Sequence, residues 1–123
     1  MEINDLTGKV IGCAIEVHKH LGPGLSESVY EQCFAHELRL AGLGFELRKN
    51  LAIRYKGVNL DCHYRLGVVV EDALIVELKT VDKLQKIHEA QLLTYLKLSG
   101  ISYGLLMNFN EALLKNGIKR MVC

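Results

Sequence analysis

Residues 58–80 read VNLDCHYRLGVVVEDALIVELKT, a stretch with a clear strand pattern. Apolar and polar residues alternate from Val58 to Val70, a period of two that is typical of a β-strand. Glu71-Asp72 predicts a turn. Residues 73–80 predict a further strand, which is apolar enough at residues 74–76 to lie in the centre of a sheet. This stretch therefore predicts two neighbouring strands joined by a tight turn.

The pattern on either side of this hairpin predicts three helices and further strands. A helix capped by Asp5 or Thr7 is expected to end at residues 22–24, which read Gly-Pro-Gly, and a second helix runs from near Ser26 to about Ala41. The remaining predicted elements are strand 45–55, a turn at 56–57, helix 82–99, strand 101–109 and a short strand 118–122. The order α-α-β-β-β-α-β, with a terminal β, predicts an α/β (α+β) fold with a central mixed sheet flanked by helices.

Composition limits the function classes. The chain has 123 residues, which fits one domain over residues 1–123, and its hydrophobic fraction of 50% excludes a disordered chain. With 15 Lys and Arg against 14 Asp and Glu, the net charge of +1 argues against a protein that coats nucleic acid by bulk attraction. No basic patch is evident along the chain, so any phosphate chemistry must come from a local site.

The compartment follows from what the sequence does not contain. No apolar run approaches the ~20 residues that a membrane helix needs, and the residues from Met1 onward lack the pattern of a secretory signal. The four cysteines, at positions 13, 33, 62 and 123, form no CxxC pair. We therefore expect a cytoplasmic protein with reduced, mostly buried thiols and no membrane partner.

Three polar features are unusual for a globular domain of this kind. Glu77 and Lys79 share one face of an apolar strand, Gln91 falls within the predicted buried stripe of the third helix, and Glu27 heads the buried stripe of the second. Each has an ordinary explanation: an exposed ion pair, a structural amide and a first-turn acid, respectively. Together, however, two carboxylates and a lysine converging on one site suit a divalent cation beside a phosphate.

Several blocks of the sequence resemble one known family. Residues 24–30 read GLSESVY and match the GxxExxY pattern that names the GxxExxY protein family. Four further blocks in the same order look like the rest of that family: Tyr64-Arg65-Leu66, residues 75–79 (IVELK), residues 88–96 (HEAQLLTYL) and residues 104–109 (GLLMNF). Residues 117–120 resemble its closing block, so the resemblance covers nearly the whole chain.

The GxxExxY family is placed in the PD-(D/E)XK nuclease superfamily, and this resemblance implies a fold and a chemistry. It implies a restriction-endonuclease-like core and cleavage of a phosphodiester in DNA or RNA with Mg²⁺ or Mn²⁺. By the same resemblance, Glu77 is a metal ligand and catalytic residue, Lys79 its catalytic lysine, Glu27 a helix-borne metal ligand, and Gln91 a polar catalytic residue on the following helix.

The sequence departs from the family pattern at position 67. The family block ends in Asp, a central metal ligand, whereas this chain reads Gly67 after Leu66. If residues 71–73 form a three-residue loop, residue 67 lies opposite Glu77, so the missing carboxylate belongs beside Glu77. Asp61 lies six residues away, roughly 20 Å along a strand, and does not replace it.

Three functions remain open from the sequence. The first is a metal-dependent nuclease, weakened by Gly67. The second is a nuclease-like protein without catalysis that binds nucleic acid or a protein partner. The third is a homodimeric interaction module, since the apolar fraction is high for so short a chain.

Overall fold

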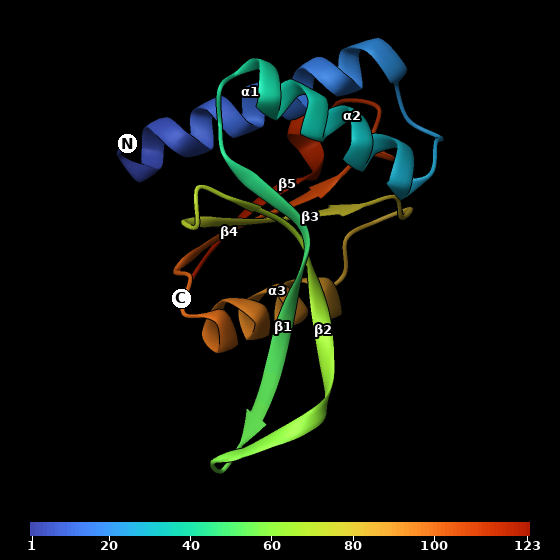
Figure 1. Ribbon diagram of the computed structural model, residues 1–123. Helices are drawn as coiled ribbons and strands as arrows, with labels where there is room; N and C mark the ends of the chain where they lie inside the picture. The colour runs from blue at the N-terminus through green and yellow to red at the C-terminus, as the bar shows by residue number, and fades with distance from the viewer.

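The computed structural model describes the backbone of residues 1–123 and every side chain except those of residues 62 and 63. Three helices, five strands and one 3-10 turn follow each other along the chain (Figure 1). They are α1 (Ile3–Leu21), α2 (Glu27–Leu40), β1 (Phe45–Tyr55), β2 (Val58–Val70), β3 (Leu74–Lys79), α3 (Lys86–Ser99), β4 (Tyr103–Asn108), η1 (Leu114–Gly117) and β5 (Ile118–Val122). The predicted order of elements is confirmed.

The sheet is mixed and follows the chain order β1-β2-β3-β4-β5. β3 and β4 are parallel and are connected through α3, whereas every other neighbouring pair is antiparallel. Helices α1 and α2 cover one face and α3 covers the other (Figure 1). The fold is therefore a three-layered α+β architecture, and none of its helices, within the residues described, is long and apolar enough to cross a membrane.

Two apolar cores lie on the two faces of the sheet. Leu74, Val76 and Leu78 pack under α1 and α2, whereas Ile75 packs against the α3 side with Leu92. This alternation along β3 was predicted from the period-two pattern and is confirmed. It places Glu77, which has the same parity as Ile75, on the α3 face near the open end of the sheet.

Alternation does not persist along β1 and β2. Leu47 and Val68 pack under α1 and α2, but Leu51 and Leu66 pack on the α3 side, although residues 47 and 51 have the same parity. The register places Arg48 opposite Gly67, and this pair is missing from the ladder. Arg48 has a φ of 51°, in the left-handed region. The two strands thus exchange faces together at Arg48 and Gly67.

Beyond this exchange, residues 49–66 form a two-stranded arm. β3 pairs only with residues 68–70 of β2, so the arm leaves the sheet after Gly67 and extends past α3, away from α1 and α2 (Figure 1). Leu51 and Leu66 anchor its base on the α3 side, while residues 54–61 at its tip are exposed. The hairpin predicted from the alternation is confirmed, and the exchange of faces at Arg48 and Gly67 is a feature that the alternation did not indicate.

Two predicted helix starts are also wrong. α1 begins at Ile3 rather than after a cap at Asp5 or Thr7, because Ile3 and Leu6 already pack into the core. α3 begins at Lys86 rather than near residue 82, and the backbone N–H of Gln85 donates to His88 Nδ1 at 2.9 Å. The segment before α3 is held instead by the buried Asn108, whose side chain bonds both backbone groups of Val81.

The thiols are less buried than predicted. Cys13 is buried, Cys33 is partly buried and Cys123 is exposed, and all three are free. The side chain of Cys62 lies outside those described. Burial is the main cause that raises the pKa of the Cys13 thiol, which keeps it in its unreactive protonated form.

Tyr30 fixes the loop that leads into α2. Its ring is fully buried and stacks on Phe109 at 4.7 Å between centroids. Its hydroxyl donates to the carbonyl of Gly22 and accepts the N–H of Leu25 at 3.1 Å. Tyr30 therefore sets where α2 begins, with Ser26 as its N-cap residue.

We expect Tyr30→Phe to lower the free energy of unfolding by about 1–3 kcal/mol, because it leaves the polar groups of a loop without their partner. Urea denaturation measures this change. Tyr55→Phe, at a tyrosine that is 60% exposed, is the control and should change stability little. Equal stabilities of the two variants would contradict the role given to the Tyr30 hydroxyl.

Candidate active site

The candidate site lies at the fork where β2 leaves β3. Beyond Val68 the two strands no longer pair, and the backbone N–H of Gly67 donates to Oε2 of Glu77 at 2.7 Å. The register of the paired residues, extended by one position, sets Gly67 opposite Glu77, as the sequence predicted. The fork therefore brings position 67, where the family resemblance implies an aspartate, directly to the Glu77 carboxylate.

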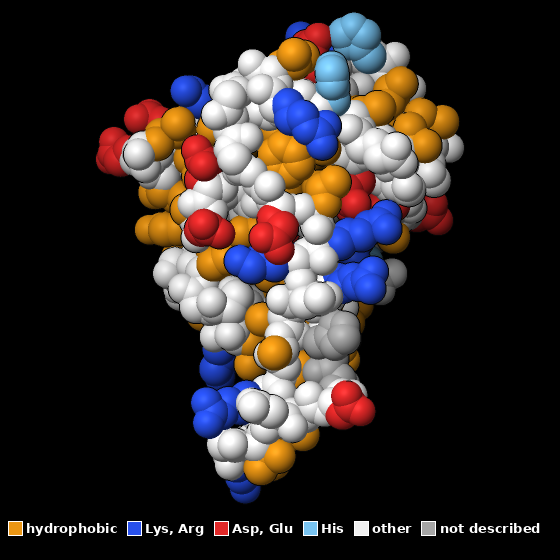
Figure 2. Space-filling model, viewed as in Figure 1, with side chains coloured by type: hydrophobic (Ala, Val, Ile, Leu, Met, Phe, Trp, Pro, Cys, Tyr) orange, Lys and Arg blue, Asp and Glu red, His pale blue; other side chains and the backbone are white. Residues whose placement is uncertain are grey.

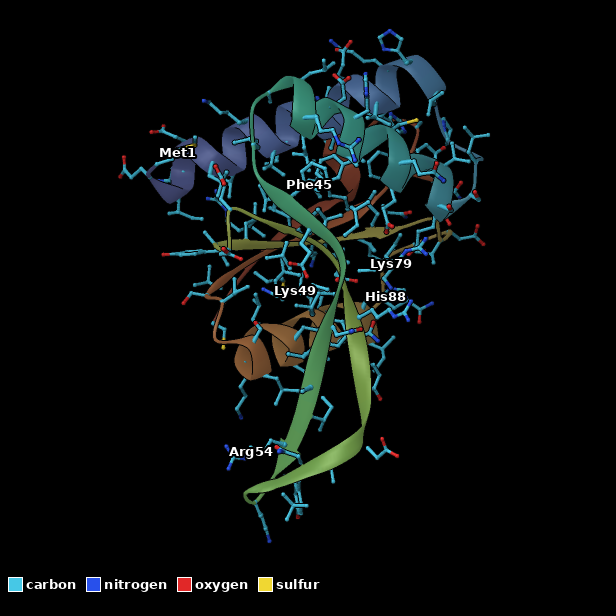
Figure 3. All side chains as sticks on the ribbon, in the orientation of Figure 1. Met1, Phe45, Lys49, Arg54, Lys79 and His88 are labelled. Atoms are coloured by element: carbon cyan, nitrogen blue, oxygen red, sulfur yellow. The ribbon has the colours of Figure 1, made fainter. Side chains whose placement is uncertain are left out.

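A surface hollow of about 450 Å³ opens beside this fork. It brings Glu77 of β3 together with Glu27 from the first turn of α2. The hollow is lined by Glu27, Ser28, Glu31, Arg48, Arg65, Leu66, Gly67 and Glu77. Figure 3 shows Lys79 at the end of β3, below α2.

The Glu77 carboxyl is in an environment that disfavours its charge. The pKa of Glu77 is raised to about 7, mainly by burial and to a smaller extent by the neighbouring carboxylates of Glu27 and Glu31. The N–H of Gly67 and the ammonium of Lys79 act in the opposite direction.

Glu27 is exposed at the rim of the hollow rather than directed into the core. Desolvation raises the pKa of the Glu27 carboxyl above its ordinary value, Lys79 lowers it, and Glu31 raises it. Lys79 thus acts on both Glu27 and Glu77, which shows that these three side chains share one electrostatic environment.

Three charged residues of the hollow were not predicted as site residues: Glu31, Arg48 and Arg65. Glu31 is buried and accepts a bond from Arg48 Nε at 3.1 Å. The spacing of Glu31, one helical turn after Glu27, was a signal that both face the same way. Nothing in the sequence pattern marked Arg48, because its position depends on the left-handed backbone at the face exchange.

Gln91 does not lie in the hollow. The buried face of α3 is formed by Leu92, Tyr95 and Leu96, so the predicted buried stripe through Gln91 is wrong. Gln91 is exposed and lines a different hollow, of about 320 Å³, between α3 and Tyr64 of the arm. The error has a simple cause: α3 packs Leu92 and Leu96 on the sheet, which turns Gln91 aside by about 100°.

The backbone around Gly67 leaves little room for a side chain. A Cβ added at Gly67 would lie 2.8 Å from the carbonyl oxygen of Val76 and 3.2 Å from Oε2 of Glu77. The carbonyl group of Val76 and the carboxylate of Glu77 therefore occupy the space where the side chain of the expected aspartate would lie.

The donor set fits a divalent cation incompletely. Among the described side chains, no three His, Cys, Asp or Glu cluster closely enough to hold a metal ion. The donors that the hollow does offer are carboxylate oxygens, the hard ligands that Mg²⁺ and Mn²⁺ prefer. Mg²⁺ in phosphate-processing enzymes is often held by one or two carboxylates together with the substrate phosphate, and Glu77 and Glu27 fit that arrangement.

The comparisons with known proteins give one match. The family model of the PD-(D/E)XK nuclease superfamily matches residues 4–121. No curated protein and no solved structure matches the chain.

Proposed function

We propose, because this chain belongs to the PD-(D/E)XK nuclease superfamily, that it is a weak metal-dependent nuclease acting on nucleic-acid phosphodiesters. The three helices and the mixed sheet form the restriction-endonuclease-like α+β fold of that superfamily. The observation that carries the proposal is the hollow at the fork, where Glu77 and Glu27 meet under the influence of Lys79.

Three residues of the hollow, Glu27, Arg65 and Glu77, and Lys79 at the end of β3 have roles in this proposal. Glu77 and Glu27 would hold Mg²⁺ or Mn²⁺, and the bound ion would supply the positive charge that polarises the phosphate and lowers the pKa of a bound water. Lys79 stabilises the negative charge that develops on the phosphate oxygens. Arg65, also on the wall of the hollow, orients a neighbouring phosphate of the substrate.

Weak activity follows from Gly67. The proposed metal site has only two carboxylates, Glu27 and Glu77, and lacks the third, an aspartate, that the superfamily pattern adds. One oxygen of Glu77 already accepts a hydrogen bond from the Gly67 N–H. We therefore propose low cation affinity in the free protein, with the substrate phosphate completing the coordination.

We also propose that the chain belongs to the GxxExxY branch of the superfamily. The supporting observation is the arrangement of the GLSESVY block, where Tyr30 anchors the loop before α2 and Glu27 reaches the hollow one turn earlier.

Cleavage of a labelled DNA duplex with millimolar Mn²⁺, compared with the same reaction in EDTA, tests the proposed function. We expect Lys79→Met to lower the cleavage rate by about 10²–10³-fold, the cost of removing a group that stabilises transition-state charge. Lys115→Met, at an exposed lysine outside the hollow, should retain the wild-type rate. Cleavage that persists in EDTA, or equal rates for the two variants, would place the chemistry elsewhere.

A second candidate function is nucleic-acid binding without cleavage. It is favoured by the hydrogen bond from the Gly67 N–H to the Glu77 carboxylate, because this bond gives Glu77 a structural role in place of a metal-binding one. Binding with no metal-dependent cleavage would select this function. The homodimer stays a prediction, and sedimentation at several concentrations tests it.

A further inference from the structure

The charges of this chain are divided unevenly between the arm and the body. The arm, residues 49–66, contains four of the 15 Lys and Arg but one of the 14 Asp and Glu. It therefore carries a net charge of +3, and the rest of the chain carries −2. Figure 2 shows basic side chains along the protruding arm and most acidic side chains on the body above it. The near-neutral total conceals a local basic patch.

Most of this positive charge is available to a partner. Lys49 pairs with Asp72 at 3.7 Å, but Arg54, Lys56 and Arg65 form no ion pair with any described side chain. Arg54 projects from the arm far from α1 and α2 (Figure 3). These three cations lie along the arm from its tip to the hollow.

The tip of the arm has little to stabilise it within the chain. Among the described elements no third strand pairs with the tip, and Tyr55 and Val58, which face each other across the turn, are 60% and 58% exposed. An isolated two-stranded ribbon is marginally stable in water. A partner that covers the tip would therefore add contacts that the chain itself does not provide.

We propose that the arm is a DNA-binding element that lies in the major groove of a duplex. This inference rests on the proposed function for its class of partner; it shares Arg65 with that function but depends on Arg54 and Lys56, which lie outside the hollow. Two paired strands are about 5 Å apart, and the major groove, roughly 12 Å wide, admits a two-stranded ribbon. In this arrangement Arg54 and Lys56 contact DNA phosphates at the tip of the arm. Arg65 contacts the DNA backbone at the base of the arm, beside the hollow that contains Glu77.

The positive charge of the arm favours DNA over a second copy of this chain as its partner. A duplex carries one negative charge per roughly 1.7 Å of its axis, whereas the body of another copy offers a net charge of only −2 to the arm. Duplex geometry selects DNA over RNA, because the major groove of an RNA helix is too narrow for side chains to read.

The test measures duplex binding without cleavage. Fluorescence anisotropy with a short labelled DNA duplex in EDTA gives Kd at several salt concentrations. We expect the double variant Arg54→Gln/Lys56→Gln to weaken binding by about tenfold or more and to reduce the salt slope by about 1–2, since each phosphate contact contributes roughly 0.9. The control Lys9→Gln/Lys19→Gln removes the same charge from exposed positions of α1 and should change Kd less than twofold.

A second double variant tests the role of charge separately, in case the first variant does not fold. Arg54→Lys/Lys56→Arg preserves the charge and should bind as the wild type does. Equal losses in the arm variant and the α1 control, or an unchanged Kd in the arm variant, would overturn the proposal. Single-stranded DNA or duplex RNA that binds as tightly as duplex DNA would overturn the groove assignment, and self-association through the arm would replace it.

The two proposals fail in different ways. Binding that depends on the arm, together with no metal-dependent cleavage, contradicts the nuclease function but leaves the arm proposal intact. Metal-dependent cleavage with an unchanged KM in Arg54→Gln/Lys56→Gln contradicts the arm and leaves the nuclease function intact.

Discussion

Gly67→Asp should bind Mn²⁺ about tenfold or more tightly than the wild type and should cleave DNA robustly. The new carboxylate would lie opposite Glu77, at the position where the family resemblance implies an aspartate. Even groups outside the coordination shell change metal affinity by roughly 10–100-fold, so a direct ligand should have at least that effect. Titration calorimetry with Mn²⁺ on both proteins measures the change.

The same substitution should destabilise the protein when no metal is present. The added Cβ must displace the carbonyl of Val76, 2.8 Å away, and such overpacking costs about 1–3 kcal/mol. The new carboxylate also adds repulsion to Glu77. Thermal unfolding in EDTA should therefore show a lower Tm than the wild type, and Mn²⁺ should raise the Tm of Gly67→Asp more than that of the wild type.

Two further variants distinguish the effect of the new carboxylate at position 67 from the effect of the added volume. Gly67→Ala introduces the same Cβ without a ligand, so it should lose stability without gaining Mn²⁺ affinity. Glu77→Ala in the Gly67→Asp background should abolish cleavage. Equal Mn²⁺ affinity in Gly67→Asp and wild type would remove the argument about position 67, and cleavage that survives Glu77→Ala would mean that the site is elsewhere.

Glu77→Gln should be more stable than the wild type above pH 7 when metal is absent. The pKa of Glu77 is about 7 in the folded protein against an ordinary value of 4.5. Between these values the folded chain keeps a proton that the unfolded chain releases, so wild-type stability falls as the pH rises through this window. The full loss is about 3 kcal/mol.

Urea denaturation in EDTA between pH 5 and roughly 8 measures this dependence. The amide of Glu77→Gln is neutral throughout and its oxygen can still accept the Gly67 N–H, so its profile should lose the Glu77 contribution. Glu46→Gln, at an exposed position of β1, should keep the wild-type slope. A wild-type profile that rises with pH across this window would contradict the buried environment assigned to Glu77.

The elements that could be predicted are those whose pattern is local. Strand alternation gave the hairpin, and counting through the three-residue loop placed Gly67 opposite Glu77. The face of α3 could not be predicted in the same way. Gln91 shares a helical stripe with Ile87 and Leu98, all of which are exposed, and only packing on the sheet reveals that Leu92 and Leu96 are the buried pair.

The site could be predicted only in part for a related reason. Glu27 and Glu77 were recognised as a motif, but the Glu31–Arg48 pair depends on a backbone conformation that strand patterns do not specify. The basic arm was missed because its charge is balanced by acidic residues elsewhere in the chain. The summed charge of +1 contains no information about that separation.

The exchange of faces at Arg48 and Gly67 determines where this chain can change in length. A single residue inserted between Arg48 and Leu51 would reverse the faces of the strand beyond it and remove Leu51 from the α3 core. Pairs of residues added next to the turn at residues 56–57 would lengthen the arm without moving either anchor. The reach of the arm can therefore vary between homologous chains while the spacing of the carboxylates stays fixed.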